Sequence, residues 1–295
     1  MRIEPLERSE LPAAAALLAT ACAFDRAAEV AEEKLFGDGP TGAPQPLVAW
    51  DGGELVGVAA VAANRIRLLA VLPSARGRGV GGALLDACSA AARAAGATAL
   101  RTLDQPGNYL APGIDERNTE TIGWLERRGW RRHGDARVNV WIEVRGNPRV
   151  SAARAGELAA MAASHGYEIR RARSDERALL EAVATEFGGA WSFELARALD
   201  HDPAGVHVAL KDGAYCGFAA HDGNNRGLGW FGPTGTWPAH RGHGLGEALL
   251  IACLVDVARH HARCEVAWIG PRAFYDKVAG IAEERRFVVL TRELS

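Results

Sequence analysis

Two glycine-rich runs hold the residues best suited to chemistry, at residues 76–81 (RGRGVG) and 241–246 (RGHGLG). Each follows an apolar stretch closed by a proline, and each leads directly into an alanine- and leucine-rich helical run. A glycine-rich turn at the start of a helix presents several unpaired backbone N–H groups together with the positive end of the helix dipole. Phosphate binds to such a turn, and Arg76, Arg78 and Arg241 add charge-assisted contacts. The sequence therefore predicts two phosphate or pyrophosphate cradles.

Two well-known phosphate-binding patterns fit these runs poorly. A P-loop needs a lysine after its last glycine, and neither run has one. Gly77, Gly79 and Gly82 match the Gly-x-Gly-x-x-Gly pattern of dinucleotide-binding folds, with Asp104 further along the chain. Glu247, however, stands where the second run needs its third glycine, and the first run follows a hairpin instead of opening a βαβ unit. The dinucleotide interpretation is therefore disfavoured.

A third pattern, Arg/Gln-x-x-Gly-x-Gly/Ala, fits both runs. Its matching residues are Arg76, Gly79 and Gly81 in the first run and Arg241, Gly244 and Gly246 in the second. In this pattern, and in the order of elements around it, the chain resembles the GCN5-related N-acetyltransferase (GNAT) superfamily. The resemblance implies acetyl-CoA binding, with the pyrophosphate on the glycine run and the pantetheine arm beside the preceding strand. One backbone N–H of that strand would also meet the thioester oxygen as it gains charge.

The resemblance also implies which residues contact the coenzyme. They are Leu69, Val71, Arg76, Gly77, Arg78, Gly79, Val80 and Gly81 in the first half, and Thr234, Thr236, Arg241, Gly242, His243, Gly244, Leu245 and Gly246 in the second. Leu69, Val71, Thr234 and Thr236 are expected to offer backbone groups to the pantetheine arm. His243 is expected to be a weak phosphate partner beside Arg241.

A tyrosine in the second half matches the general acid that many members of the family use. Amine acetylation is helped by an acid that protonates the departing thiolate and by a base that accepts the amine proton. Tyr275 stands at the acid position, whereas Leu125 takes that position in the first half, which lacks the acid unless Tyr109 substitutes. No base is evident, and Glu194, Asp222 and a water-mediated route all remain open.

The elements around the runs occur twice in the same order. Each half reads as a strand, two helices, three strands, the helix after the glycine run, a strand, a helix and one or two strands. This order favours an α/β unit with a mixed sheet, of the α+β kind, over an alternating doubly wound fold. Residues 138–144 and 287–292 are the expected last strands. We expect an N-terminal GNAT-like domain at residues 1–146, a linker at 147–166 and a C-terminal GNAT-like domain at 167–295.

Composition and net charge limit the classes of partner that the protein is expected to bind. The 295 residues are 48% hydrophobic and carry a net charge of −2, so no global field favours nucleic acid or an anionic membrane. The start of the chain does not read as a signal peptide, no stretch is long enough to cross a bilayer, and the five scattered cysteines read as reduced thiols. His260, His261 and Cys264 lack a convincing set of further ligands, so no metal is expected. The protein is predicted to be cytoplasmic.

The sequence thus predicts an N-acetyltransferase of two tandem domains, in which a substrate amine attacks bound acetyl-CoA directly and one domain only binds coenzyme. The acceptor is a small-molecule amine or a peptide or protein amine, and the protein is a monomer or homodimer. Two alternatives stay open: a non-catalytic scaffold that binds acyl-CoA, and an acetyltransferase of a thiol precursor of the mycothiol synthase type.

Overall fold

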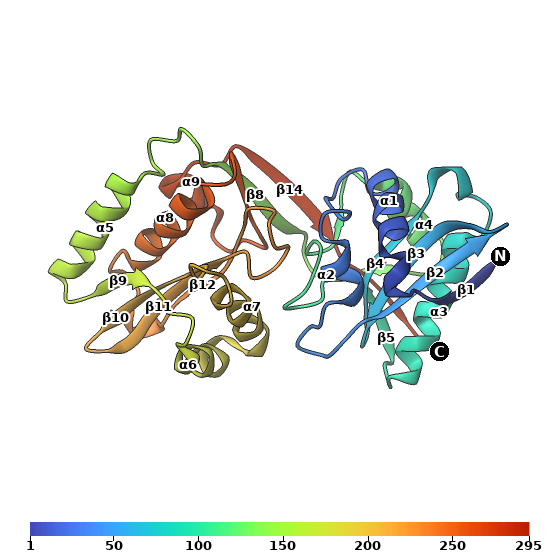
Figure 1. The fold of residues 1–295 in the computed structure, drawn as a ribbon, viewed down its shortest axis with the longest axis horizontal. Helices are drawn as coiled ribbons and strands as arrows, with labels where there is room; N and C mark the ends of the chain where they lie inside the picture. Colours follow the sequence, from blue (N-terminus) through green and yellow to red (C-terminus); the bar gives the residue numbers. More distant parts are fainter. Residues whose placement is uncertain (295) are drawn as a thin grey trace. The chain divides into compact units, whose positions relative to one another are not determined.

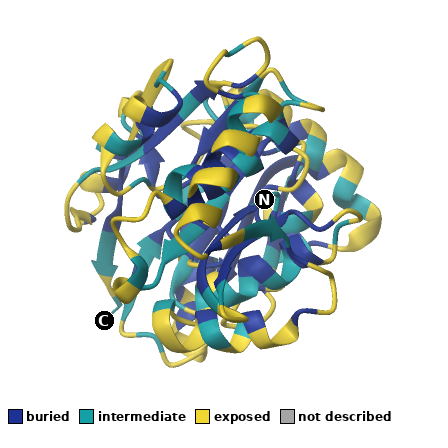
Figure 2. Cartoon of the chain, turned by 90° about the vertical axis from the view of Figure 1, so that its left-hand side faces the viewer, coloured by how far each residue is buried: buried dark blue, intermediate teal, exposed yellow. Residues whose placement is uncertain are grey.

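The computed structural model describes residues 1–294, and the chain forms two compact units. Unit 1 comprises residues 1–137 and 286–295, and unit 2 comprises residues 138–285. In both units the central strands are largely buried, and the outward faces of the helices are exposed (Figure 2). None of the helices in the described part of the chain has the length and apolar character needed to span a membrane.

Unit 1 is a mixed sheet covered on both faces (Figure 1). The strand order is β1-β2-β3-β4-β5-β15-β7. The strands are β1 Arg2–Pro5, β2 Gln45–Asp51, β3 Glu54–Ala62, β4 Arg65–Val71, β5 Ala99–Thr102, β6 Ile114–Asp115, β7 Arg131–Arg132 and β15 Leu290–Glu293; the helices are α1 Leu11–Ala21, α2 Ala31–Phe36, α3 Val80–Ala94 and α4 Thr119–Glu126. The helix α3 packs with the strands around one core, and α1 and α2 contact the other face of β3 and β4.

Unit 2 repeats this arrangement, with the strand order β14-β8-β13-β12-β11-β10-β9, and β6 pairs antiparallel with Phe287 and Val288, the end of β14 that lies in unit 1. The strands are β8 Arg137–Glu143, β9 Glu168–Arg171, β10 Val206–Lys211, β11 Ala214–His221, β12 Trp230–Thr236, β13 Arg263–Val266 and β14 Glu283–Val288; the helices are α5 Ala152–Ser164, α6 Arg177–Phe187, α7 Gly189–Leu199, α8 Leu245–Val257 and α9 Arg272–Val278. One face of the sheet packs against α8, α5 and α9, and the other against α6 and α7. The mixed α/β fold expected from the sequence is confirmed in both units.

The last strands are exchanged between the two halves of the chain. The strand β8 follows the first repeat but pairs antiparallel with β13 in unit 2, whereas β15, at the chain end, pairs antiparallel with β5 in unit 1. The expectation that residues 138–144 close the first half and 287–292 the second is therefore wrong. The strands β5 and β13 are equivalent in the two units, and either β8 or β15 could pair antiparallel with either of them. The sequence pattern alone therefore cannot distinguish the two pairings.

Because of this exchange, the boundaries of the two compact units differ from those of the sequence repeat. The expected domain ranges, 1–146 and 167–295, follow the repeat in the sequence. As the bounds of that repeat they remain a prediction. The expected linker holds α5, which packs against α8 and places Leu158 and Ala162 in the core of unit 2. That helix is therefore part of unit 2 in the structure.

Candidate functional site

In each unit, the strand before the glycine run loses its parallel neighbour halfway along. The strands β4 and β5 are paired only at Arg65 with Arg101 and Ile66 with Thr102, although β4 continues to Val71. In unit 2, β12 and β13 are paired only at Trp230 with Glu265 and Phe231 with Val266. The later halves of β4 and β12 therefore have an edge that no parallel strand covers.

A bulge in each strand decides which backbone groups face that edge. In β4 the register shifts between Ile66 and Leu68, and Leu72 N–H then donates to Val56 O at 3.0 Å. Because backbone groups alternate in direction along a strand, those of Leu69 and Val71 point away from β3.

The strand β12 shows the same pattern. The register shifts between Phe231 and Thr234, and Trp237 N–H donates to Cys216 O at 3.0 Å. The backbone groups of Thr234 and Thr236 thus point away from β11. These are the four strand positions from which the sequence predicts contacts to a pantetheine arm.

Both glycine runs form tight left-handed turns at the start of a helix. Gly77 and Gly79 have φ of 77° and 88°, and Gly242 and Gly244 have φ of 84° and 75°. A residue with a side chain adopts such φ values only with strain. A Cβ placed on any of the four would meet no atom within 4 Å, so the space above each turn is open.

The first turn of each helix leaves its backbone N–H groups free for a ligand. The first helical hydrogen bonds run from Ala83 N to Gly79 O at 3.0 Å and from Ala248 N to Gly244 O at 3.1 Å. The N–H groups of the residues between are those that a helix N-terminus leaves without an intrahelical partner. The side chains of Val80 and Leu245 are buried in the two cores, so these residues offer only their backbone. A Cβ at Gly81 or Gly246 would touch an aromatic ring, at 3.4 and 3.6 Å.

The basic residues of the two runs are held by the protein itself. Arg78 pairs with Asp51, and Arg76 donates to Ala21 O at 3.3 Å. In unit 2, Arg241 Nε donates to Thr236 O at 3.1 Å, which draws its guanidinium back toward β12. The ring Nδ1 of His243 lies 3.1 Å from Arg241 O.

A pocket of about 220 Å³ lies against the second glycine run. Its walls include Arg241 and Gly244 from the run, with Phe274 and Lys277 from α9. His240 also lines it, and its Nδ1 lies 3.1 Å from the hydroxyl of Tyr167. His240, Phe274 and Lys277 were not expected from the sequence. Lys277 comes two residues after Tyr275 on the same helix, and that proximity was the one signal for it. The cationic side chains and open glycines fit a phosphate-bearing coenzyme arm.

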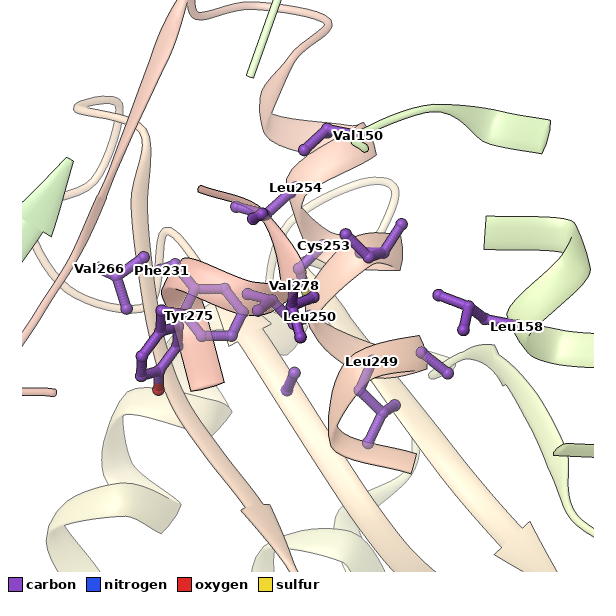
Figure 3. Close-up of a cluster of buried hydrophobic side chains, with 14 of the residues drawn as sticks. Val150, Leu158, Phe231, Leu249, Leu250, Cys253, Leu254, Val266, Tyr275 and Val278 are labelled. Atoms are coloured by element: carbon purple, nitrogen blue, oxygen red, sulfur yellow. The ribbon is translucent and has the colours of Figure 1, made fainter. Parts of the chain in front are cut away.

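Tyr275 lies on α9 at the margin of the core of unit 2. Its side chain is buried among the apolar cluster, and its hydroxyl points away from the aliphatic neighbours (Figure 3). Burial raises the pKa of Tyr275 to about 12. Just past the end of the helix, Gly280 adopts a φ of 79° and its N–H donates to the carbonyls of Tyr275 and Asp276. In unit 1, Leu125 is buried in the core, so that unit has no hydroxyl there.

Comparisons with known proteins identify the family of both halves of the chain. A model of the GNAT acetyltransferase domain matches residues 44–132, and a model of the GNAT acetyltransferase family matches residues 167–281. The chain is a tandem GNAT protein. The family consists of acyltransferases, and its enzymes act in general on amines. No curated protein sequence matches the chain significantly.

Solved structures with the same fold include another tandem member. One is a tandem GNAT protein from the clavulanic acid biosynthesis pathway, with 22% identity, a TM-score of 0.68, and coverage of 100% of this chain and 98% of that one. Another is a GCN5-related N-acetyltransferase from Sphaerobacter thermophilus, with 19% identity, a TM-score of 0.70, and coverage of 99% and 95%. A third is a GCN5-related glucosamine N-acetyltransferase region of a fungal multi-domain β-N-acetylglucosaminidase, with 17% identity and a TM-score of 0.77. That match covers 99% of the present chain but only 38% of the fungal chain. At these identities the likeness shows the fold.

The carboxylates named as candidate bases of the tandem GNAT protein have other partners. Asp222 lies 3.1 Å from His221 Nδ1, and this partner lowers the pKa of the carboxyl although burial opposes it. Glu194 is buried on α7. Within residues 1–294 no group of three or more His, Cys, Asp or Glu side chains is arranged to hold a metal ion.

The residue at the bulge of β4 in unit 1 and the one at the bulge of β12 in unit 2 differ in size and charge. In unit 1 it is Arg67, which is fully buried and reaches under α2, where it donates to Gln105 Oε1 and Gly37 O, both at 2.5 Å. Beside it Lys34, also fully buried, bonds to Asn108 Oδ1 at 2.8 Å. In unit 2 the bulge holds Gly232, and a Cβ placed there would meet no atom within 4 Å. The same place beside the strand is thus filled in unit 1 by the side chains of Arg67 and Lys34, the latter paired with Glu33 at 2.7 Å, and is open in unit 2.

Proposed function

We propose that the tandem GNAT protein is an N-acetyltransferase that moves an acetyl group from acetyl-CoA to an amine, and that unit 2 carries the chemistry. The contrast at the strand bulge supports this division most strongly. An acceptor amine must reach the strand that holds the thioester, and in unit 1 the buried side chains of Arg67 and Lys34 fill that approach. Gly232 leaves it open in unit 2, the unit that also has Tyr275.

In the proposed reaction, the backbone of Thr234 and Thr236 orients the pantetheine arm, and the glycine run holds the pyrophosphate. The amine nitrogen attacks the thioester carbonyl, so a C–N bond forms while the C–S bond breaks. A strand N–H stabilises the charge on the carbonyl oxygen. Tyr275 donates its hydroxyl proton toward the departing sulfur, and the amine loses a proton to solvent or to a base.

Unit 1 is proposed to bind the coenzyme without transferring the acetyl group. It has the open glycine turn and the unpaired strand edge, but Leu125 replaces the acid. The acceptor is a small-molecule amine or an amine of a peptide or protein. No metal takes part in the proposed reaction.

Calorimetry of acetyl-CoA binding to a Gly244→Glu variant tests the proposed cradle. The glutamate would strain a backbone at φ of 75° and place a carboxylate against the pyrophosphate. We expect affinity at the unit 2 site to fall by at least about 100-fold, which corresponds to about 2.7 kcal/mol.

The matched control for this variant is Gly213→Glu. Gly213 has a φ of 79° and open space in the β10–β11 hairpin turn, so it carries the same backbone cost away from the cradle. Unchanged binding in Gly244→Glu, or an equal loss in both variants, would contradict the assignment.

A further inference from the structure

Four aromatic rings gather on one side of β12 in unit 2. Phe187 ends α6, Trp191 lies in the first turn of α7, Phe218 is on β11 and Trp237 follows β12. The Phe187 ring centre lies 5.4 Å from that of Trp191 with an interplanar angle of only 14°, and 5.0 Å from that of Trp237. Trp191 is the most exposed of the four, at 37%. One face of its indole is thus covered by Phe187, and part of the side chain is open to solvent.

The rings rest on the strand segment from which the pantetheine contacts are predicted. A Cβ on Gly235 would lie 2.9 Å from the rings of both Phe187 and Phe218, so the absence of a side chain there lets the rings reach the backbone. Gly235 lies between Thr234 and Thr236. On the neighbouring strand, a Cβ on Gly217 would meet Leu249 of α8 at 3.0 Å. Because successive residues face opposite sides of a sheet, the rings lie on the side that α8 does not cover.

Unit 1 provides an internal comparison, because it has the same strands without the rings. The pair Phe218 and Gly235 corresponds by register to Val58 and Ala70. Trp237, whose N–H donates to β11, corresponds to Leu72, whose N–H donates to β3. At these two strand positions, aliphatic residues are therefore sufficient in unit 1. The fold does not require the rings of Phe218 and Trp237, and they occur in the unit whose strand bulge is open.

We propose that Trp191, stacked on Phe187, is the platform that receives the acceptor, and that the acceptor is a primary amine on a ring-bearing small molecule. This inference rests on the proposed acetyl transfer in unit 2. An exposed indole face binds flat aromatic rings by offset stacking and also attracts a nearby ammonium group. The C–H face of a pyranose ring offers a similar flat apolar surface. A linear alkylamine has no such face and gains little from the platform.

Steady-state kinetics with three amines test this role. Tryptamine represents an aromatic ring, glucosamine a pyranose ring, and n-butylamine a chain without a ring. We expect at least one ring amine to have a lower KM than n-butylamine. In Trp191→Ala the KM of that ring amine should rise about tenfold, which corresponds to about 1.4 kcal/mol, while kcat and the KM of acetyl-CoA stay within about twofold.

Three further variants separate recognition from folding. Trp191→Phe should restore most of the affinity, because it keeps a flat ring. Trp191→Leu, which keeps apolar volume without a flat face, should not restore it. The matched control is Phe193→Ala, which removes a partly buried ring from the same helix and should leave the KM values unchanged. Recovery with leucine equal to that with phenylalanine would show that Trp191 only packs, and would overturn the proposal.

Ligand-observed NMR of the same amines separates this inference from the proposed function, because it needs no turnover. Binding of a ring amine that is lost in Trp191→Ala supports the platform even if no amine is acetylated. Turnover without any preference for ring amines, or an unchanged KM in Trp191→Ala, overturns the platform while acetyl transfer stands. No binding of either ring amine to the native protein also overturns it.

Discussion

Replacing Tyr275 with phenylalanine is expected to lower kcat about 100-fold, because a positioned general acid contributes a factor of this size or more. The KM of acetyl-CoA should change little, since the ring and its packing in the core are kept. The measurement is the initial rate of thiol release at saturating acetyl-CoA and amine.

The pH dependence of the native protein gives a second readout of Tyr275. Because burial raises its pKa to about 12, the hydroxyl remains protonated and able to donate. We therefore expect no loss of kcat from ionisation of Tyr275 up to about pH 10, where a tyrosine of ordinary pKa would be half ionised. Tyr215→Phe, on a half-buried tyrosine of β11, is the matched control. A full kcat in Tyr275→Phe at every pH would show that Tyr275 is not the acid.

Replacing Arg67 with alanine is expected to destabilise unit 1 by about 1–3 kcal/mol, because Gln105 Oε1 loses its buried donor and Gly37 O keeps only the longer bond from Asn108 Nδ2, at 3.3 Å. The acetylation rate should stay unchanged at temperatures where unit 1 remains folded. Urea unfolding followed by hydrogen–deuterium exchange reports each unit separately.

The control for this variant is Arg131→Ala, which removes an exposed arginine of the same unit. A drop in kcat as large as that expected for Tyr275→Phe would place the chemistry in unit 1. Unchanged stability would mean that the Arg67 network does not hold α2 to β4.

Local patterns in the sequence predicted the features that depend on local chemistry. The structure contains the two predicted glycine turns, the helices that follow them and the hairpins before them. These features depend on backbone conformation and apolar periodicity, which a few neighbouring residues determine. The family and the mixed fold follow from the same patterns and are confirmed. The coenzyme contacts and the role of Tyr275 stay predictions, although Leu69, Val71, Thr234 and Thr236 do face the uncovered strand edge.

Features that depend on long-range pairing were not predicted from the sequence. The exchange of β8 and β15 was missed because each of them could pair with either β5 or β13. The burial of Arg67 was not predicted, because an arginine on a strand normally turns to solvent. Its burial depends on partners far away in the sequence, among them Gln105 and Gly37. Lys277 reaches the pocket through the packing of α9, whereas His240 lines it because it directly precedes the glycine run.

The claim that unit 2 carries the chemistry is tested most directly by comparing acetylation rates of Gly79→Glu and Gly244→Glu on the same amine. Both substitutions place a glutamate at a left-handed glycine with open space, one in each unit. We predict that Gly244→Glu loses at least about 100-fold in kcat/KM, whereas Gly79→Glu stays within about twofold of the native protein. The opposite ranking, or an equal loss in both variants, would contradict the division of labour between the two units.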